Sequence, residues 1–281
     1  MIRTDICVIG AGSGGLSVAA GAVQMGASVV LVEGDRMGGD CLNAGCVPSK
    51  ALIAAAARAE AQRGTRFGVA GAGPQVDFGA VKDHVAGVIA TIAPVDSQER
   101  FEGLGCTVLR GWARFVSPRE VAVGDERIRA RRFVIATGSR PMVPDVPGLD
   151  GVPYLTNESV FALRERPSHL VILGGGPIGM EMAQAHRRLG CAVTVVEAAR
   201  ALGREDAEAS AVVLARLVAE GVDIRQGAAA VRVRTVGDGI ELVLADGQVV
   251  TGSHLLVAVG RRVALDRLDL AAGGWSLTAA G

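Results

Sequence analysis

The residues best suited to chemistry are two cysteines, Cys41 and Cys46, in the stretch GGDCLNAGCVPSK at positions 38–50. A regular helix would place their side chains about 140° apart, so a bond between the sulfurs requires irregular backbone. Gly45 and Pro48 suit such a break. Cys46 would then lie at a helix N-terminus, where the helix dipole favours the thiolate. The pattern therefore predicts dithiol–disulfide exchange.

Three other interpretations of the pair stay open: a structural disulfide, a zinc site and two inert thiols. A structural disulfide is uncommon in a cytosolic protein. A zinc site needs further ligands, and the histidines are scattered, at His84, His169, His186 and His254. We expect no metal site. The other cysteines, in or beside apolar strand-like runs, are interpreted as small buried hydrophobes: Cys7, Cys106 and Cys191.

A glycine-rich turn precedes the cysteine stretch. A predicted buried strand at 2–9 leads into the turn, an apolar helix follows at 16–25, and a second strand at 28–32 ends in Glu33. This is the βαβ dinucleotide fingerprint in its required context, with the acid 18 residues after the last glycine. The glycines would shape the turn, and Glu33 would accept hydrogen bonds from ribose hydroxyls. The predicted site residues are Gly10, Gly12, Ser13, Gly14, Gly15 and Glu33.

The fingerprint occurs a second time. A strand at 170–173, a helix at 180–189 and a strand at 192–196 surround it, and the acid is again 18 residues past the third glycine. The second copy supplies Gly174, Gly176, Pro177, Ile178, Gly179 and Glu197. The repeat continues downstream, because FVIATG at 133–138 is echoed by LLVAVG at 255–260. The sequence thus predicts an α/β protein with two Rossmann-like dinucleotide-binding domains, each a three-layer parallel sheet with a small antiparallel meander.

Further elements follow from the apolar pattern. We expect helices at 51–63, 78–101 and 206–220, with Pro94 interrupting the second, and a loop at 67–74. The expected strands lie at 107–109, 112–116, 120–123, 126–130, 132–136, 223–226, 231–236, 240–244 and 248–251. After Gly260 the pattern fades, and no further element is predicted.

Composition limits the function classes. The chain has 281 residues, 49% hydrophobic and 21% charged, with a formal net charge of zero. That balance, with no basic run, argues against nucleic acid or an anionic membrane as partner. The uncharged run at 6–32 divides into strand, turn, helix and strand, so it is not interpreted as a signal peptide or membrane span. We expect a cytoplasmic protein.

These motifs resemble the flavin-dependent pyridine nucleotide–disulfide oxidoreductases, a family that includes dihydrolipoamide dehydrogenase, glutathione reductase and mercuric reductase. The resemblance rests on the first fingerprint, residues 38–50, ATGSRP at 136–141, and the second fingerprint through Glu181. It implies FAD in the first site, extended by Gly39, Asp40, Thr137, Gly138 and Ser139. It implies a nicotinamide nucleotide in the second, extended by Gly260. Glu197 favours NAD over NADP, although Arg200 is near enough to soften that preference.

The resemblance also implies catalytic roles. Cys46 would face the flavin as the charge-transfer thiolate, and Cys41 would exchange with the substrate. Lys50 would lie by the flavin N5 and pair with Glu181. Electrons would pass between NAD(H) and a thiol or disulfide substrate, small or protein-bound, as in dihydrolipoamide dehydrogenase. Ser49 before Lys50 resembles that enzyme and mercuric reductase more than glutathione reductase.

The resemblance implies domain boundaries as well: an FAD domain at 1–150 with the redox insert, a nicotinamide domain at 151–265, and an incomplete return to the FAD domain at 266–281. Family chains continue into an interface domain that forms the homodimer and supplies a catalytic His–Glu pair. After Gly260 this sequence has no histidine. We therefore expect this chain to be a fragment or a degenerate relative that is defective in turnover by itself. The sequence does not define its oligomeric state or its catalytic base.

Other functions remain open. A mercuric reductase-like enzyme is the alternative within the family. A non-catalytic nucleotide-binding or redox-sensing module would bind FAD and hold a titratable disulfide without turnover. A flavin oxidase or transhydrogenase would not need thiols, and the presence of both Cys41 and Cys46 argues against it.

Overall fold

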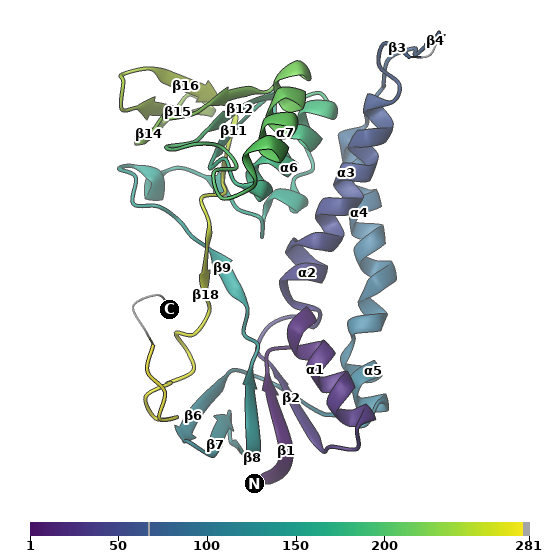
Figure 1. Ribbon diagram of the computed structural model, residues 1–281, viewed down its shortest axis with the longest axis vertical. Helices are drawn as coiled ribbons and strands as arrows, with labels where there is room; N and C mark the ends of the chain where they lie inside the picture. Colours follow the sequence, from purple (N-terminus) through teal and green to yellow (C-terminus); the bar gives the residue numbers. More distant parts are fainter. Residues whose placement is uncertain (67, 278–281) are drawn as a thin grey trace. The chain divides into compact units, whose positions relative to one another are not determined.

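The computed structural model describes residues 1–66 and 68–277 and divides into two compact units. The first unit comprises Met1–Val47, Val88–Arg140 and Arg262–Gly281. The second comprises Pro48–Gly87 and Pro141–Arg261. Each is a parallel sheet with helices and an antiparallel part, so the predicted α/β fold with two Rossmann-like units is confirmed (Figure 1).

The first unit contains a six-stranded sheet in the order β5-β2-β1-β8-β7-β6. Its parallel half lies beside helix α1 (Ser13–Gln24), and its antiparallel half is the meander β6-β7-β8 (Figure 1). The strands are β1 (Ile2–Ile9), β2 (Val29–Glu33), β5 (Thr107–Arg110), β6 (Ala113–Ser117), β7 (Glu120–Val123) and β8 (Glu126–Ile135). The prediction of two strands at 126–130 and 132–136 is wrong, because β8 runs through Arg131 and pairs with β1 along its length.

Both faces of this sheet are covered, which explains the apolar run at residues 6–9 in the second half of β1. Val8 packs into a core with Leu16 of α1 and Phe101. Cys7 and Ile9 point into the opposite core, where Phe115 and Leu268 lie. Leu268 belongs to the segment after Gly260, and its carbonyl accepts a 2.8 Å hydrogen bond from the N–H of Phe115. The apparent fading of the pattern there therefore hides a segment that closes one face of the sheet.

The segment between β2 and β5 is helical. It contains α2 (Gly39–Ala44), α3 (Cys46–Glu60), α4 (Phe78–Ile92), the 3₁₀ turn η1 (Ala93–Asp96) and α5 (Gln98–Gly103). Pro94 interrupts the helix as predicted. The predicted loop at 67–74 contains part of a small hairpin, β3 (Thr65–Arg66) and β4 (Val69–Ala70), and its residue 67 lies outside the described residues.

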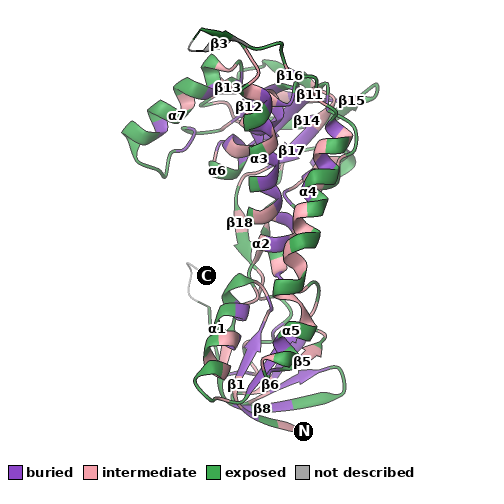
Figure 2. Cartoon of the chain, turned by 90° about the vertical axis from the view of Figure 1, so that its right-hand side faces the viewer, coloured by how far each residue is buried: buried purple, intermediate pink, exposed green. Residues whose placement is uncertain are grey.

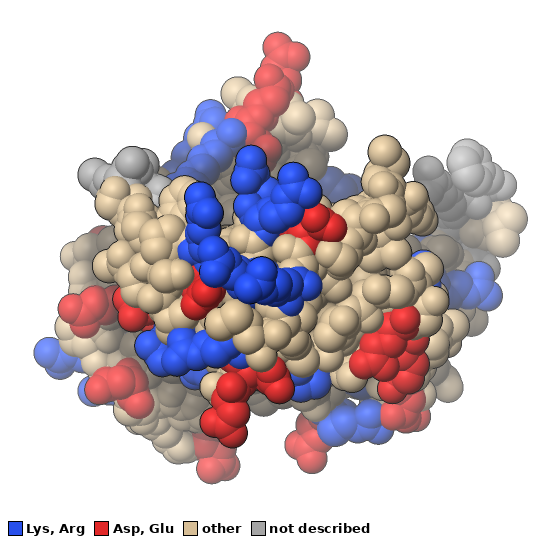
Figure 3. Space-filling view, turned by 90° about the horizontal axis from the view of Figure 1, so that it is seen from below, with Lys and Arg blue, Asp and Glu red and all other residues tan. Residues whose placement is uncertain are grey.

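One helical stretch, Phe78–Gly103, is long and apolar enough to cross a membrane by length and composition alone, with 26 residues and a mean hydropathy of 1.2. This is weak evidence for a membrane span, because core helices pass the same test. The stretch is also divided by η1 and carries Asp96, Glu99 and Arg100. On the face shown in Figure 3, several basic side chains lie next to one another near the centre, and acidic side chains lie mostly around them.

The second unit repeats the architecture. Its five-stranded parallel sheet has the order β10-β17-β11-β12-β13, and a separate three-stranded meander has the order β14-β15-β16. The strands are β10 (Tyr154–Leu155), β11 (His169–Leu173), β12 (Ala192–Val196), β13 (Asp223–Arg225), β14 (Ala230–Val236), β15 (Gly239–Leu244), β16 (Val249–Gly252) and β17 (His254–Val257). Its other helical elements are α6 (Pro177–Arg188), α7 (Ala207–Ala219), η2 (Leu149–Gly151) and η3 (Val160–Ala162). Figure 2 shows α7 largely exposed, whereas buried residues concentrate in the strands.

Outside these sheets, β9 (Ser139–Pro141) pairs with β18 (Arg261–Val263). Strand β18 was not predicted, because two arginines occupy its first positions. The cysteines predicted to be buried, Cys7, Cys106 and Cys191, are all buried, and their pKa values are raised by desolvation.

A buried polar cluster lies in the second unit. His186 of α6 is fully buried, and its Nδ1 lies 2.8 Å from the carbonyl oxygen of Met182. The imidazole Nε2 has no hydrogen-bond partner among the described residues. Lys82 of α4 is also buried and donates to the carbonyl of Val160 at 2.9 Å. Burial first, and then the charge of Lys82, lower the pKa of His186 to about 4.

This pKa predicts a pH-dependent stability. Above pH 6.5 the imidazole of His186 is neutral in both the folded and the unfolded chain. Below pH 6.5 the unfolded chain binds a proton at His186, whereas the folded chain does so only near pH 4. The free energy of unfolding should therefore fall as pH decreases from 6.5 towards 4, by up to about 3 kcal/mol from this group. Urea unfolding at pH 7 and pH 5 measures the loss. The loss of stability should be smaller in His186→Gln and unchanged in His84→Gln, because His84 is exposed. An equal loss in all three proteins would contradict the assignment.

Candidate active site

The two cysteines occupy the junction between α2 and α3. Cys41 lies in α2, and Cys46 begins α3, five residues earlier than the predicted start of that helix. Between them the chain leaves helical geometry at Gly45 (φ −127°, ψ −117°). A Cβ at Gly45 would lie 2.9 Å from the carbonyl oxygen of Asp40, so the tight turn requires glycine. The irregular backbone that the spacing demands is present.

The turn brings the cysteines into contact. The Cys41 thiol is hydrogen-bonded to the side chain and the backbone of Cys46. Cys41 is half-buried and Cys46 is exposed, and both are free cysteines. Burial raises the pKa of Cys41, and the hydrogen bond to Cys46 and the charge of that neighbour raise it further.

The segment that carries the cysteines is fixed to the first glycine turn. Gly38 and Gly12 form a parallel β-bridge, and the N–H of Gly38 donates to the carbonyl of Ala11 at 2.9 Å. Gly39 has φ +56°, and a Cβ there would lie 2.6 Å from the Cα of Gly12. Asn43 closes the same segment by donating to the carbonyls of Met37 and Gly39. The redox segment thus starts in backbone contact with the dinucleotide turn.

The two glycine turns have the same construction. A Cβ on Gly10 or Gly15 would overlap the backbone at Ala136 and Gly10, respectively. In the second copy, Gly174 would meet Ala258 and Gly179 would meet Gly174. Each helix begins at a glycine N-cap, Gly12 for α1 and Gly176 for α6, with no side-chain capping bond.

The two acids at the strand ends also match. Glu33 is buried and accepts from the N–H groups of Ala11 at 2.6 Å and Asp35 at 2.7 Å. Glu197 accepts from Gly175 at 2.7 Å and Ala199 at 2.8 Å. Each carboxylate therefore ties the second residue of its turn to the segment after the strand. The sequence predicted both acids as ribose ligands but did not predict this structural role.

The turns fit pyrophosphate-bearing cofactors. A Cβ built on Gly14 or Gly176 meets no atom within 4 Å, so open space adjoins each helix start. The N–H groups of the first helical turn, together with the helix dipole, form an anion site there. Asp40 lies in the first turn of α2, and the backbone N of Thr137 adjoins Gly10. Ser13, Pro177 and Ile178 are exposed at the helix starts.

Lys50 and Glu181 lie together. Lys50 is one turn after Cys46 in α3, and its Nζ lies 2.6 Å from Oε1 of Glu181 in α6. The side chains are 61% and 40% exposed, so the pair contributes at most about 1 kcal/mol to stability. Its position one turn from Cys46 is therefore more informative than its energy. No group of three or more metal-ligating side chains occurs in the described part of the chain.

Comparison with known proteins agrees with this geometry. The family model described as pyridine nucleotide-disulphide oxidoreductase matches residues 4–280. The chain belongs to this family. A mercuric reductase of Streptomyces lividans is 40% identical over 95% of the chain, and a dihydrolipoyl dehydrogenase of Thermus scotoductus is 36% identical over 96%.

A solved structure of the HOCl-induced flavoprotein disulfide reductase RclA from Escherichia coli is similar along 98% of the chain, with 27% identity and a TM-score of 0.86. The chain spans 58% of the Streptomyces protein and 60% of the Thermus and Escherichia coli proteins.

The contact between Gly39 and Gly12 predicts that alanine destabilises the protein at position 39 but not at position 14. Gly39→Ala forces a Cβ against Gly12 at a positive φ and should lower the free energy of unfolding by about 1–3 kcal/mol. Gly14→Ala is the matched control, because its Cβ meets open space. It should change stability by about 0.5 kcal/mol or less, or increase it. Chemical denaturation without cofactor measures both. Equal stability of the two variants would show that the contact is not a constraint.

Proposed function

We propose that this chain forms the electron-transfer core of an FAD-dependent oxidoreductase that connects a nicotinamide nucleotide to a thiol or disulfide substrate through Cys41 and Cys46. The observation that carries the proposal is the contact between the two thiols at the start of α3, on a segment that touches the first glycine turn. Membership of the disulphide oxidoreductase family supports it.

The residues that would hold FAD are those of the first turn, with Glu33, Gly39, Asp40 and 137–139. When bound, FAD supplies the capacity to accept hydride from a nicotinamide and to deliver two electrons to a disulfide. Reduction of the Cys41–Cys46 disulfide consumes two electrons and two protons and leaves two thiols. Cys41 would then attack the substrate disulfide, break its S–S bond and release one substrate thiol. Cys46 would attack the mixed disulfide, release the second substrate thiol and restore the Cys41–Cys46 disulfide. Burial and the adjacent sulfur raise the pKa of Cys41, the thiol that would meet the substrate.

The second turn, with Gly260 at the end of its sheet, would bind the nicotinamide nucleotide. Glu197 is held at the strand end by two N–H groups, a position from which its charge disfavours a 2′-phosphate. We therefore propose NAD as the preferred cofactor. Lys50, one turn from Cys46 and ion-paired with Glu181, would place a positive charge near the reacting flavin edge. We also propose that the protein is cytoplasmic and that it forms a homodimer at the full length of its relatives.

Two substrate classes are supported by particular observations. Dihydrolipoamide-like dithiols fit the similarity to the Thermus enzyme. Ser49 before Lys50 is compatible with both classes. Mercuric ion fits the similarity to the Streptomyces enzyme, and adjacent thiols are ligands that soft metals prefer. We propose the dithiol–disulfide reaction as the primary activity and mercuric ion as the alternative.

Anaerobic titration of the FAD-loaded protein with NADH, followed by visible spectroscopy, tests the relay. A long-wavelength band from a thiolate beside the flavin should appear, and it should be lost in Cys46→Ser. Cys41→Ser leaves the Cys46 thiolate in place and should keep the band. NADPH should require at least about tenfold higher concentration, as expected for repulsion of a 2′-phosphate by Glu197. Bleaching of the flavin without the band in the unaltered protein would contradict the proposal.

A further inference from the structure

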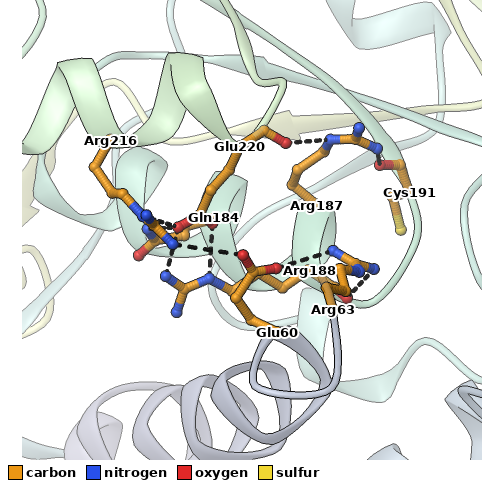
Figure 4. A network of polar contacts seen from close by, with 8 residues as sticks. All are labelled: Glu60, Arg63, Gln184, Arg187, Arg188, Cys191, Arg216 and Glu220. Carbon is orange, nitrogen blue, oxygen red and sulfur yellow. Dashed lines mark hydrogen bonds and ion pairs between the residues drawn. The ribbon is translucent and has the colours of Figure 1, made fainter. Parts of the chain in front are cut away.

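A polar cavity of about 410 Å³ in the second unit is separate from the glycine turns. It is lined by Glu60, Arg63, Arg187, Arg216, Ala219 and Glu220. These residues come from the end of α3, the end of α6 and the end of α7, with Arg63 just past α3. In Figure 4 the charged groups of Glu60, Arg63, Arg216 and Glu220 converge, whereas the Arg187 guanidinium points toward main-chain oxygens beside them.

Glu220 is the centre of the network. Its side chain is 4% exposed and accepts from Arg188 at 2.7 Å through both oxygens, from Arg216 at 2.6 Å and from Gln184 at 3.2 Å. Burial would raise the pKa of Glu220, but the arginines outweigh it, and the net shift is downward. The carboxylate is therefore ionised and fully engaged with partners of the protein itself.

The cations of the network outnumber its anions. Glu60 accepts from Arg63 at 3.2 Å and from Arg216 at 3.4 Å, so these arginines share the two carboxylates with Arg188. Arg187 is different. It is half-buried, and among the described residues it bonds only main-chain carbonyls, those of Glu220 at 2.8 Å and Cys191 at 3.4 Å.

Three guanidinium groups and two carboxylates thus line the cavity, which leaves one positive charge there. Arg188 lies outside the lining and is bonded to Glu220. Each guanidinium has five N–H donors in a planar fork. The hydrogen bonds and ion pairs described above use only some of these donors, and the remainder are available to a ligand. Planar forks match the oxygens of phosphate, and a phosphate anion would neutralise the excess charge.

We propose that this cavity is a binding site for a small phosphate-bearing anion, distinct from both dinucleotide sites. Arg187 supplies the uncompensated charge, and Arg63 and Arg216 supply further N–H donors at the rim. The cavity is larger than a phosphate ion, so it has room for a small organic group attached to the phosphoryl group.

Binding of inorganic phosphate, measured by isothermal titration calorimetry at constant ionic strength, tests the site. The unaltered chain should bind one equivalent of phosphate at this cavity. Arg187→Gln and Arg63→Gln should each lower the affinity for that equivalent about tenfold or more, as expected for losing a charge-assisted hydrogen bond. Arg234→Gln is the matched control, because Arg234 is an exposed arginine ion-paired with Glu241 in the same unit, and it should bind like the unaltered chain.

Circular dichroism establishes that each variant is folded. If Arg187→Gln does not fold, Arg63→Gln decides, since its side chain is 35% exposed. Phosphate bound at either glycine turn is unaffected by these substitutions, so the test is independent of the proposed oxidoreductase activity. No phosphate binding to the unaltered chain, or equal binding by Arg63→Gln and Arg234→Gln, would overturn the proposal.

Discussion

The close approach of Gly39 to Gly12 is the constraint on which the proposed chemistry depends. Backbone of the redox segment lies directly against backbone of the first dinucleotide turn, at a distance that leaves no room for a Cβ. Asn43 then fixes α2, Gly45 breaks the helix, and Cys46 starts α3 beside Cys41. A series of short-range contacts thus connects the position of the first glycine turn to the position of the two sulfurs.

The two copies of the fingerprint solve the same physical problem in the same way. In each, a carboxylate at a strand end accepts two backbone N–H bonds, and it connects the turn to the next segment. The copies differ in what surrounds them. The first turn contacts the cysteine segment through Gly38 and Gly39, whereas the end of the helix that follows the second turn contributes arginines to a cavity of its own. The two copies of the fingerprint therefore share their turn geometry but lie beside different features, the cysteine segment in the first unit and the polar cavity in the second.

Local patterns predicted most of the fold. Both fingerprints, the interruption at Pro94 and the break at Gly45 followed from glycine and proline chemistry within a few residues. The misses were non-local. Arg131 and Arg132 interrupt an apolar run, yet β8 continues because β1 supplies its hydrogen-bond partners. Leu268 stands in a weakly patterned segment, but it is buried against Phe115. The Glu220 network also had no sequence signal, because its members are spread from Glu60 to Glu220 and each is an ordinary helix-surface charge by itself.

Differential alkylation with mass spectrometry tests the central claim, that Cys41 and Cys46 form the exchangeable pair. In the reduced native protein, iodoacetamide should modify these two cysteines, and Cys7, Cys106 and Cys191 should react only after denaturation, because they are buried. After mild oxidation with diamide, a peptide containing both Cys41 and Cys46 should lack two hydrogens and resist alkylation. Continued alkylation of both cysteines after oxidation, or a disulfide to any other cysteine, would contradict the account.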